Sequence, residues 1–433
     1  MNIPTLLSAL AATKRIPVLL AFLLPVLSGA AQNFDFAEQV FGFLQEGRGD
    51  SICARLAPQM AAAVTPETFG RAYAGLERSL GKMNRRGDWR RDKAGTTTAD
   101  YCKLYFGDTP LKLTVVTDES QRILALTLTP LPPEKSDTEE RKSDGIEAGC
   151  GTERSITVEN GDVRLPGTLT LPHGADRPVP VVVFVHGSGP NDRDETLGPN
   201  RLFRSLSDSL AKAGIASLRY DKRTFVYRVR PDETGGCNDY DSETVDDAVA
   251  AVRLAASQPE TDPSRVFIIG HSQGAMLAPR IANRCPDTPA GIVALAAPAR
   301  PLAVLLREQL AYISQSQGGT TDDVEATVEK LLGGVPPAYR HFADTYDAPG
   351  EAKSTPCPML FVQGGHDYQV TAKDFALWKA ALAGHDGADF AFFPLCDHLM
   401  RELPRMAVPA DYMAARPLSP AVVRRIVGFI SGH

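Results

Sequence analysis

A serine set between glycines, after a strand-like run and before a helix-like run, is the feature that most constrains this chain. The motif Gly-His-Ser-Gln-Gly at residues 270–274 follows a β-branched and aromatic run at 265–269 and precedes an apparent helix at 275–283. Such a turn pushes the serine hydroxyl out of the sheet, and it needs glycine where the two backbones leave no room for a Cβ. We predict a nucleophile at Ser272; the alternative is a structural turn, because the chain holds 36 glycines and the motif can arise by chance.

A carboxylate and a histidine follow in the order that this chemistry needs. A serine hydroxyl is a useful nucleophile only when an imidazole takes its proton, and a carboxylate must hold that imidazole in the right tautomer. Asp367 comes just after a strand expected at residues 358–363, and His398 lies in the loop after a strand expected at 388–393. We therefore predict Asp367 and His398 as the acid and the base that serve Ser272.

Both assignments have alternatives. Asp367 follows a Gly-Gly pair and could be an ordinary turn aspartate. Asp397 is a rival acid, but it is adjacent to His398, and neighbours in a loop rarely point at each other. Among the rival bases, His385 precedes the last strand, at the opposite edge of the sheet, and His433 is the last residue.

An oxyanion hole is the fourth part of such a site. Residues 180–185 form an unbroken apolar run, typical of a buried parallel strand, and lead into a loop of small residues at 186–190. Small residues let backbone N–H groups face a developing oxyanion without intervening side chains. We expect the N–H of Gln273 as the first donor and the N–H of Ser188 as the second, with Gly189 as the alternative.

Three segments carry a resemblance to a known family. They are His-Gly-Ser-Gly-Pro-Asn-Asp-Arg-Asp at 186–194, Gly-Ile-Ala-Ser-Leu-Arg-Tyr-Asp-Lys-Arg at 214–223, and the serine motif at 270–274. From about residue 150 onward the chain resembles the α/β-hydrolase superfamily. Within it, the chain is similar to two-domain bacterial esterases whose catalytic domains are like serine aminopeptidases or dienelactone hydrolases.

The resemblance implies a doubly wound, mostly parallel α/β sheet and carboxylesterase activity, often on short acyl chains. It implies Ser272, Asp367 and His398 as the catalytic triad, and a segment at 192–194 that shapes the mouth of the site. The candidate substrate contacts are Gly187, Gly189, Asp192, Arg193 and His271.

Two positions depart from the family pattern. Thr224 stands where glycine is often found after Lys-Arg, and Gln273 stands where glutamate is often found after the nucleophile. Neither is a triad residue, but both could alter the pocket.

Composition is that of an ordinary globular protein and argues against a nucleic-acid partner. The 433 residues are 43% hydrophobic and 23% charged, with a net charge of −6, and this length suggests two domains. No basic stripe is present, and the arginine cluster at residues 85–91 fits a solvated face better than a phosphate site.

The expected partner is a small-molecule ester, and the sequence leaves a monomer and a homodimer both open.

The first 31 residues are typical of a signal peptide. Lys14 and Arg15 precede an apolar run at residues 16–27, and small residues for cleavage follow at 28–31. The apolar run is short for a membrane span, and no cysteine closely follows it, which argues against a lipoprotein. We expect export to the periplasm or beyond, with no stable membrane association after cleavage.

Export changes how the seven cysteines are interpreted, because thiols pair in an oxidising compartment. Cys53 and Cys102 are the two within the N-terminal region, so they are the first candidates for a disulfide. No Cys-x-x-Cys occurs and the histidines are not spaced for zinc, so we expect neither a metal nor a cofactor.

The chain is expected to fold as two domains joined by a linker at residues 131–149. Residues 33–130 should form a small α+β domain, with helices near 36–44 and 66–80 before an antiparallel sheet. The α/β-hydrolase domain should take residues 150–433. Within it, residues 299–355 interrupt the alternation of strand and helix, as a helical lid that favours small acyl groups would do.

Three functions are compatible with these residues. The first is a secreted carboxylesterase that works through an acyl-enzyme at Ser272. The second is a peptidase or thioesterase on the same triad; an aminopeptidase would need acidic residues for the substrate amine, and Asp192, Asp194 and Glu195 could serve. The third is a binding protein on an inactive hydrolase scaffold, against which the complete set of Ser, Asp and His speaks.

Overall fold

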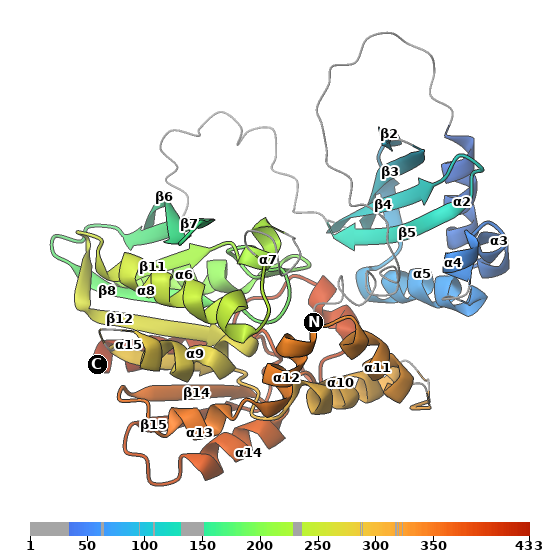
Figure 1. The fold of residues 1–433 in the computed structure, drawn as a ribbon. Helices are drawn as coiled ribbons and strands as arrows, with labels where there is room; N and C mark the ends of the chain where they lie inside the picture. The colour runs from blue at the N-terminus through green and yellow to red at the C-terminus, as the bar shows by residue number, and fades with distance from the viewer. Residues whose placement is uncertain are drawn as a thin grey trace. The chain divides into compact units, whose positions relative to one another are not determined.

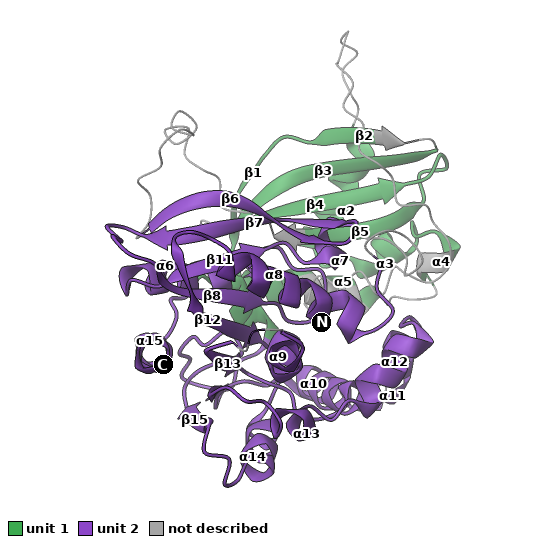
Figure 2. Ribbon diagram, turned by 60° about the vertical axis from the view of Figure 1, so that its left-hand side comes forward, with its two compact units in different colours: residues 1–140, 409–415 green, residues 141–408, 416–433 purple. Residues whose placement is uncertain are grey.

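The computed structural model contains two compact units, which Figure 2 colours separately. Unit 1 is Met1–Glu140 with Pro409–Ala415, and unit 2 is Arg141–Val408 with Arg416–His433. The residues that the structure describes are 34–61, 65–94, 96–106, 109–130, 151–227, 236–285, 287, 289–316, 318, 320–322 and 324–433. The expected signal peptide, the expected linker and Cys150 lie outside them. No helix within the described ranges is both long and apolar enough to cross a membrane.

Unit 2 is built on an eight-stranded sheet with the order β15-β14-β13-β12-β8-β11-β7-β6 (Figure 1). The strands from β15 to β11 are parallel, and β7 and β6 add an antiparallel pair at one edge. The strands are β6 (Gly151–Asn160), β7 (Val163–Pro172), β8 (Val179–Val185), β11 (Ala216–Tyr220), β12 (Thr261–His271), β13 (Gly291–Leu295), β14 (Met359–Gly364) and β15 (Ala388–Phe393). The predicted α/β class with a mostly parallel sheet is confirmed.

Helices cover both faces of this sheet, which explains why its central strands are continuous apolar runs. On one face, Phe184 of β8 stacks on Phe203 of α6, and Phe267 of β12 meets Phe429 of α15. The other face packs against α8 and α9. The helices are α6 (Leu202–Lys212), α8 (Asp246–Ala256), α9 (Gln273–Arg284), α14 (Ala372–Ala381) and α15 (Pro420–Gly432). Shorter elements are β9 (Thr196–Leu197), β10 (Asn200–Arg201), α7 (Arg223–Val226) and the π-helix η1 (Asp241–Val245).

The segment between β13 and β14 is helical, as its periodicity indicates. Its helices are α10 (Leu302–Ser316), α11 (Val324–Gly333), α12 (Pro337–Thr345) and α13 (Ala348–Ala352). Helices α10, α11 and α12 lie together in Figure 1, and α10 contacts both of the others.

Unit 1 joins helices to a five-stranded antiparallel sheet. Its path is β1-β3-β4-β5, with β2 paired to β3. The elements are α2 (Asp35–Gln45), α3 (Gly49–Cys53), α4 (Pro58–Ala61), α5 (Pro66–Leu80), β1 (Met83–Arg86), β2 (Arg90–Ala94), β3 (Thr97–Phe106), β4 (Thr109–Thr117) and β5 (Ile123–Pro130). A late segment, η2 (Pro409–Met413), packs on α5. No pattern in the sequence indicates that the chain returns to this unit.

Cys53 and Cys102 do not form the expected disulfide; among the described cysteines, these two side chains are not joined. Both instead belong to the apolar core of unit 1, where Cys102 is buried on β3 and Cys53 packs against the same cluster. Burial raises the pKa of the Cys102 thiol to about 12, so it behaves as a small apolar side chain.

Trp378 on α14 offers a test of how unit 2 is held together. Its ring is 1% exposed and packs on Phe361, and its Nε1–H donates to the carbonyl oxygen of Ala297 at 2.9 Å. We expect Trp378→Phe to lower the free energy of unfolding by about 2–4 kcal/mol, because it leaves a cavity and an unpaired carbonyl. Denaturant unfolding would measure this. Leu377→Ala, on the same helix at a side chain 43% exposed, is the matched control and should stay within about 0.5 kcal/mol.

Candidate active site

Ser272 occupies a strained turn between the end of β12 and the start of α9. Its φ of 53° and ψ of −118° lie in a region that non-glycine residues rarely adopt. The turn is held because the N–H of Ser272 donates to the carbonyl oxygen of Leu295 at 2.9 Å, while its own carbonyl accepts from the N–H of Met276. Ser272 is partly exposed although the residues on either side of it are buried. The local backbone therefore presents this hydroxyl at the carboxyl edge of the parallel strands.

Two glycines make this turn sterically feasible. A Cβ on Gly270 would lie 2.3 Å from the carbonyl oxygen of Gly274, and a Cβ on Gly274 would lie 2.2 Å from that of Val185. No heavy atoms approach that closely without a clash. The glycines therefore let α9 start directly against the end of β8.

Asp367 and His398 meet at the same edge of the sheet. Nδ1–H of His398 donates to Oδ2 of Asp367 at 2.7 Å, and both side chains are buried. The other oxygen of Asp367 accepts the backbone N–H groups of Gln369 and Val370 at 2.8 and 3.0 Å. The carboxylate is thus fixed by its own loop, and its Oδ2, which also accepts from Nε2 of Gln363 at 3.5 Å, orients the imidazole.

Glycines also bring the loops of Asp367 and His398 together. A Cβ on Gly364 would lie 2.3 Å from the carbonyl oxygen of Cys396, and one on Gly365 would lie 2.4 Å from that of Pro394. The loop after β14 therefore passes in direct backbone contact with the loop after β15.

The rival residues have other partners. Asp397 forms a buried ion pair with Arg401, with Oδ2 2.5 Å from Nη2. Nδ1 of His385 accepts from the N–H of Gly387 at the start of β15, and Nδ1–H of His433 donates to the carbonyl oxygen of Phe429.

The loop after β8 is fixed through Gly187. The N–H of Gly187 donates to Oε1 of Glu195 at 2.7 Å, and its carbonyl oxygen accepts from Nζ of Lys222 at 2.9 Å and Nδ2 of Asn191 at 3.0 Å. A Cβ on Gly187 would lie 3.3 Å from Cβ of Ser272, so the loop lies directly against the serine. Asn191 also donates to the carbonyl oxygen of Ser188 at 3.2 Å. Ser188 and Gly189 follow in this loop, and their roles as oxyanion donors stay predictions.

The segment at 192–194 uses its side chains within the protein. Arg193 forms an ion pair with Asp221, with Nη2 2.8 Å from Oδ2. Asp192 accepts from the N–H and the hydroxyl of Thr196 at 2.9 and 2.7 Å. Asp194 pairs with the buried guanidinium of Arg219.

His271 lies between two acceptors. Its Nε2 is 2.9 Å from the carbonyl oxygen of His398, and its Nδ1 is 3.1 Å from Oε2 of Glu195. Burial, the largest single effect, disfavours the protonated imidazole, but the Glu195 carboxylate, the His398 carbonyl and Asp367 together outweigh it, and the pKa of His271 is raised. His271 is therefore placed as a structural partner of the His398 loop; its proposed contact with substrate stays a prediction.

A buried polar network lies beneath the serine turn. Lys222 forms an ion pair with Glu243 at 2.9 Å, and both side chains are buried. Nε2 of Gln273 donates to Oε2 of Glu243 at 3.1 Å and to the hydroxyl of Tyr339 at 3.0 Å. Tyr339, on α12, donates its hydroxyl to the same glutamate at 2.5 Å. Burial and this carboxylate raise the pKa of Tyr339, so the hydroxyl keeps its proton.

Sequence reasoning named Gln273 but missed Lys222, Glu243 and Tyr339 as parts of the site. Asn191 and Glu195 lie in or next to the rare string at 186–194, and Lys222 lies in the string at 214–223, so the family resemblance pointed near them. Glu243 and Tyr339 stand in no motif, and their place depends on how η1 and α12 pack.

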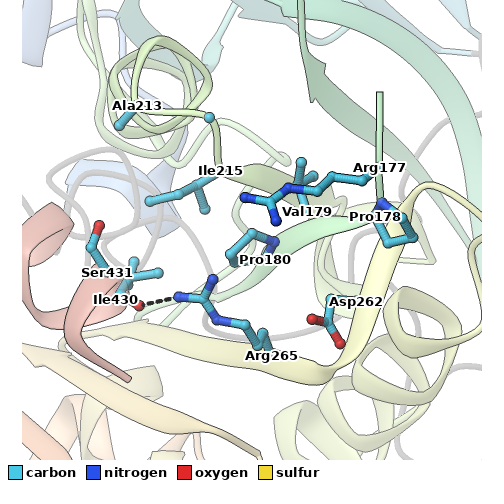
Figure 3. A pocket seen from close by; sticks show the side chains of 11 residues that line it. Arg177, Pro178, Val179, Pro180, Ala213, Ile215, Asp262, Arg265, Ile430 and Ser431 are labelled. Atoms are coloured by element: carbon cyan, nitrogen blue, oxygen red, sulfur yellow. Dashed lines mark hydrogen bonds between the residues drawn. The ribbon is translucent and has the colours of Figure 1, made fainter. Parts of the chain in front are cut away.

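A pocket of about 380 Å³ lies elsewhere in unit 2 (Figure 3). It is lined by the starts of β8 and β12, the turn after α6 and the end of α15, with Arg177, Asp262 and Arg265 around it. Parallel strands begin at that edge of the sheet, whereas Ser272 and His398 follow strands that end at the opposite edge. Among the described residues no group of His, Cys, Asp and Glu is arranged to hold a metal ion.

Comparisons with known proteins show which proteins this chain is similar to. A family model described as the prolyl oligopeptidase family matches residues 233–406. Esterase EstD of Thermotoga maritima is 38% identical over 302 residues, which are 67% of this chain and 70% of the relative. Among solved structures, a dienelactone hydrolase from Anabaena variabilis is 19% identical, with a TM-score of 0.42 over 66% of this chain and 99% of that one. Est1E from Butyrivibrio proteoclasticus is 15% identical, with a TM-score of 0.43 over 64% and 98%.

The Lys222–Glu243 pair offers a test of the network. We expect Lys222→Met to lower the free energy of unfolding by about 3–5 kcal/mol, because it leaves a buried carboxylate without its cation. Adding Glu243→Gln should recover part of that loss, since the uncompensated charge is then gone. Arg154→Met, which breaks the exposed pair with Glu260, is the control and should change the free energy of unfolding by about 1 kcal/mol or less. Equal losses in the single and double variants would contradict this account.

Proposed function

The chain belongs to the esterase family that includes EstD, within the α/β-hydrolases, and from this premise we propose that it is a carboxylesterase for short-acyl esters that acts through Ser272, His398 and Asp367. The observation that carries the proposal is the buried contact between His398 and Asp367, together with a serine held at a positive φ whose neighbour His271 contacts the main chain of His398. The substrate is a small-molecule ester.

The reaction proceeds through an acyl-enzyme. Oγ of Ser272 attacks the ester carbonyl while Nε2 of His398 takes the hydroxyl proton, and the C–O bond to the alcohol breaks as His398 returns that proton to the leaving oxygen. Water then attacks the acyl-serine with the same base, which releases the acid and restores the hydroxyl. Asp367 keeps the Nδ1 proton in place and stabilises the imidazolium that forms in each step.

The developing oxyanion is bound by the backbone. Gln273 is the first residue of α9, where an N–H has no acceptor within its own helix. Ser188 follows Gly187, whose peptide groups are held by Glu195 and Lys222. We assign the N–H groups of Gln273 and Ser188 as the two donors, because a rigid loop and a helix start keep them fixed while charge develops.

The structure favours an ester over a peptide with a free amino terminus. An aminopeptidase needs carboxylates that face the substrate amine. The candidates for this role are Asp192, Asp194 and Glu195. All three are engaged, with Thr196, Arg219 and His271 respectively. The match to the prolyl oligopeptidase family keeps a peptidase as the second candidate, which dipeptide substrates would test.

The helical insert supports a preference for short acyl groups. Tyr339 of α12 contacts the side chain of Gln273, the residue next to the nucleophile. A helix anchored so close to the serine restricts the space for a long acyl chain.

Hydrolysis of p-nitrophenyl esters from acetyl to lauroyl tests the proposal. We expect kcat/KM to be highest for the short esters, and Ser272→Ala to lower kcat by about 10⁴-fold or more, because the acyl-enzyme can no longer form. Ser209→Ala, on α6, is the matched control and should leave the rate unchanged. The assignment would be overturned if the folded wild-type protein hydrolysed dipeptides or acyl thioesters faster than esters.

We also propose that the protein is exported, on the basis of the basic and apolar pattern in its first 31 residues. Expression of the full chain in a Gram-negative host should yield periplasmic protein whose amino terminus is near residue 31. Amino-terminal sequencing of the fractionated protein would measure this, and an intact Met1 in the cytosolic fraction would contradict export.

A further inference from the structure

His271 is a buried side chain that the triad does not use, and both of its ring nitrogens face acceptors. Nε2 lies 2.9 Å from the carbonyl oxygen of His398, and Nδ1 lies 3.1 Å from Oε2 of Glu195. A carbonyl oxygen and a carboxylate can only accept, so each needs a proton on the nitrogen that it faces. A neutral imidazole has one N–H and would direct a lone pair at one of them. The surroundings therefore favour the imidazolium form.

Glu195 extends this contact to the other side of the site. Its Oε1 accepts the N–H of Gly187 at 2.7 Å, while Oε2 faces His271. The backbone of Glu195 has a φ of 50°, and its N–H donates to the carbonyl oxygen of Asp192 at 3.0 Å. A strained backbone that points a buried carboxylate at two specific partners is typical of a functional constraint.

We propose that Glu195 and protonated His271 form a positioning pair that sets the main chain of His398 against the oxyanion loop at Gly187. The inference rests on the proposed function, because it concerns the base and the oxyanion donors of that reaction. One buried ion pair then links the two parts of the site that must act on the same carbonyl carbon. Its contact is ionic in character, since the Nδ1–H of His271 is not aligned with Oε2 as in a linear hydrogen bond.

The charged groups around His271 favour its protonation. Oε2 of Glu195 lies 3.1 Å from Nδ1 of His271, and the centroid of the His398 ring lies 4.6 Å from that of His271. The negative charge of Asp367, the partner of His398, also raises the pKa of His271. His186, which also interacts electrostatically with Glu195, contributes no cation at neutral pH, because burial lowers its pKa to about 4. Against the effect of burial, Glu195 raises the pKa of His271, and His271 in turn helps to lower the pKa of Glu195.

The direction of the pH effect follows. A group with a raised pKa in the folded state keeps its charged contacts below that pKa and loses them as the pH rises through it. Loss of the proton from His271 removes the donor from one of its two contacts, so His398 loses its support or Glu195 loses its counter-ion. The pair therefore adds an alkaline decline in kcat that is separate from the titration of the catalytic base.

Nitrogen-15 NMR of histidine-labelled enzyme tests the charge without any substrate. His271, assigned by its absence in His271→Gln, should show both ring nitrogens protonated at pH 7. In Glu195→Gln, the new amide can donate to Nδ1, so His271 should be neutral and still donate from Nε2 to His398. A neutral His271 in the wild type at pH 7 overturns the proposal, whatever the enzyme hydrolyses.

The pH profile of kcat for the best ester tests the positioning role. The wild type should lose activity at alkaline pH, and both Glu195→Gln and His271→Gln should lack that decline. His271→Gln should lower kcat at pH 7 by about 10–100-fold while KM changes little, because a displaced base affects the chemical step more than binding. Glu195→Gln should lower kcat less, since it keeps the Nε2 contact.

Matched controls separate a local effect from a general one. His385→Gln and Glu260→Gln, at residues outside the site, should reproduce the wild-type profile. Retention of the alkaline decline in both site variants, with fold confirmed by circular dichroism, overturns the proposal. Absence of ester hydrolysis in the wild type overturns the proposed function instead, and the NMR result then stands by itself.

Discussion

The close approach of three backbones at Ser272 is the constraint on which the site depends. Here β12 ends, α9 begins, and the end of β8 lies beside them. The three backbones are so close that Gly270 and Gly274 have space for a hydrogen atom but not for a Cβ. This contact forces Ser272 into a positive φ and directs its side chain away from the sheet. It also lays the loop that follows β8 against the serine, which is why the proposed nucleophile and the proposed oxyanion loop, from distant parts of the chain, share one edge. A second close approach, of Gly364 and Gly365 to the loop after β15, does the same for the proposed acid and base.

Buried charge then fixes what the backbone has brought together. Gly187 is held at its N–H by Glu195 and at its carbonyl by Lys222, so the loop proposed to bind the oxyanion is fixed at both peptide groups of this residue. The cation of Lys222 is balanced by Glu243, and the carboxylate of Glu195 is balanced by His271. An isolated buried charge would lower the free energy of unfolding. A buried charge that is paired and fully hydrogen-bonded avoids that loss and holds its neighbours rigidly. Rigidity is useful where donors must keep their places as an oxyanion develops.

Much of this site could be read from local patterns. The strand–serine–helix context indicated a candidate nucleophile, and chain order after it singled out Asp367 and His398, which the structure joins at 2.7 Å. The sequence was less informative where a residue acts through a distant partner. Glu195 appeared as one more acidic residue at the mouth of the site, suited to a substrate amine, but its carboxylate faces inward to His271 and Gly187. The Cys53–Cys102 bond was inferred from location alone, and the core of unit 1 uses both side chains as apolar groups.

The sequence by itself determined where many of the strands and helices lie and the position of the serine turn, because each depends on residues close together in the chain: apolar runs, their period, and glycines at fixed offsets. The mostly parallel sheet was expected from the family resemblance. Only the tertiary structure decided which polar side chains serve the chemistry and which hold it in place. Tyr339, Glu243 and Lys222 come from three separate elements and converge beneath Gln273. Their contact depends on how helices pack on the finished sheet, and no short stretch of sequence carries that information.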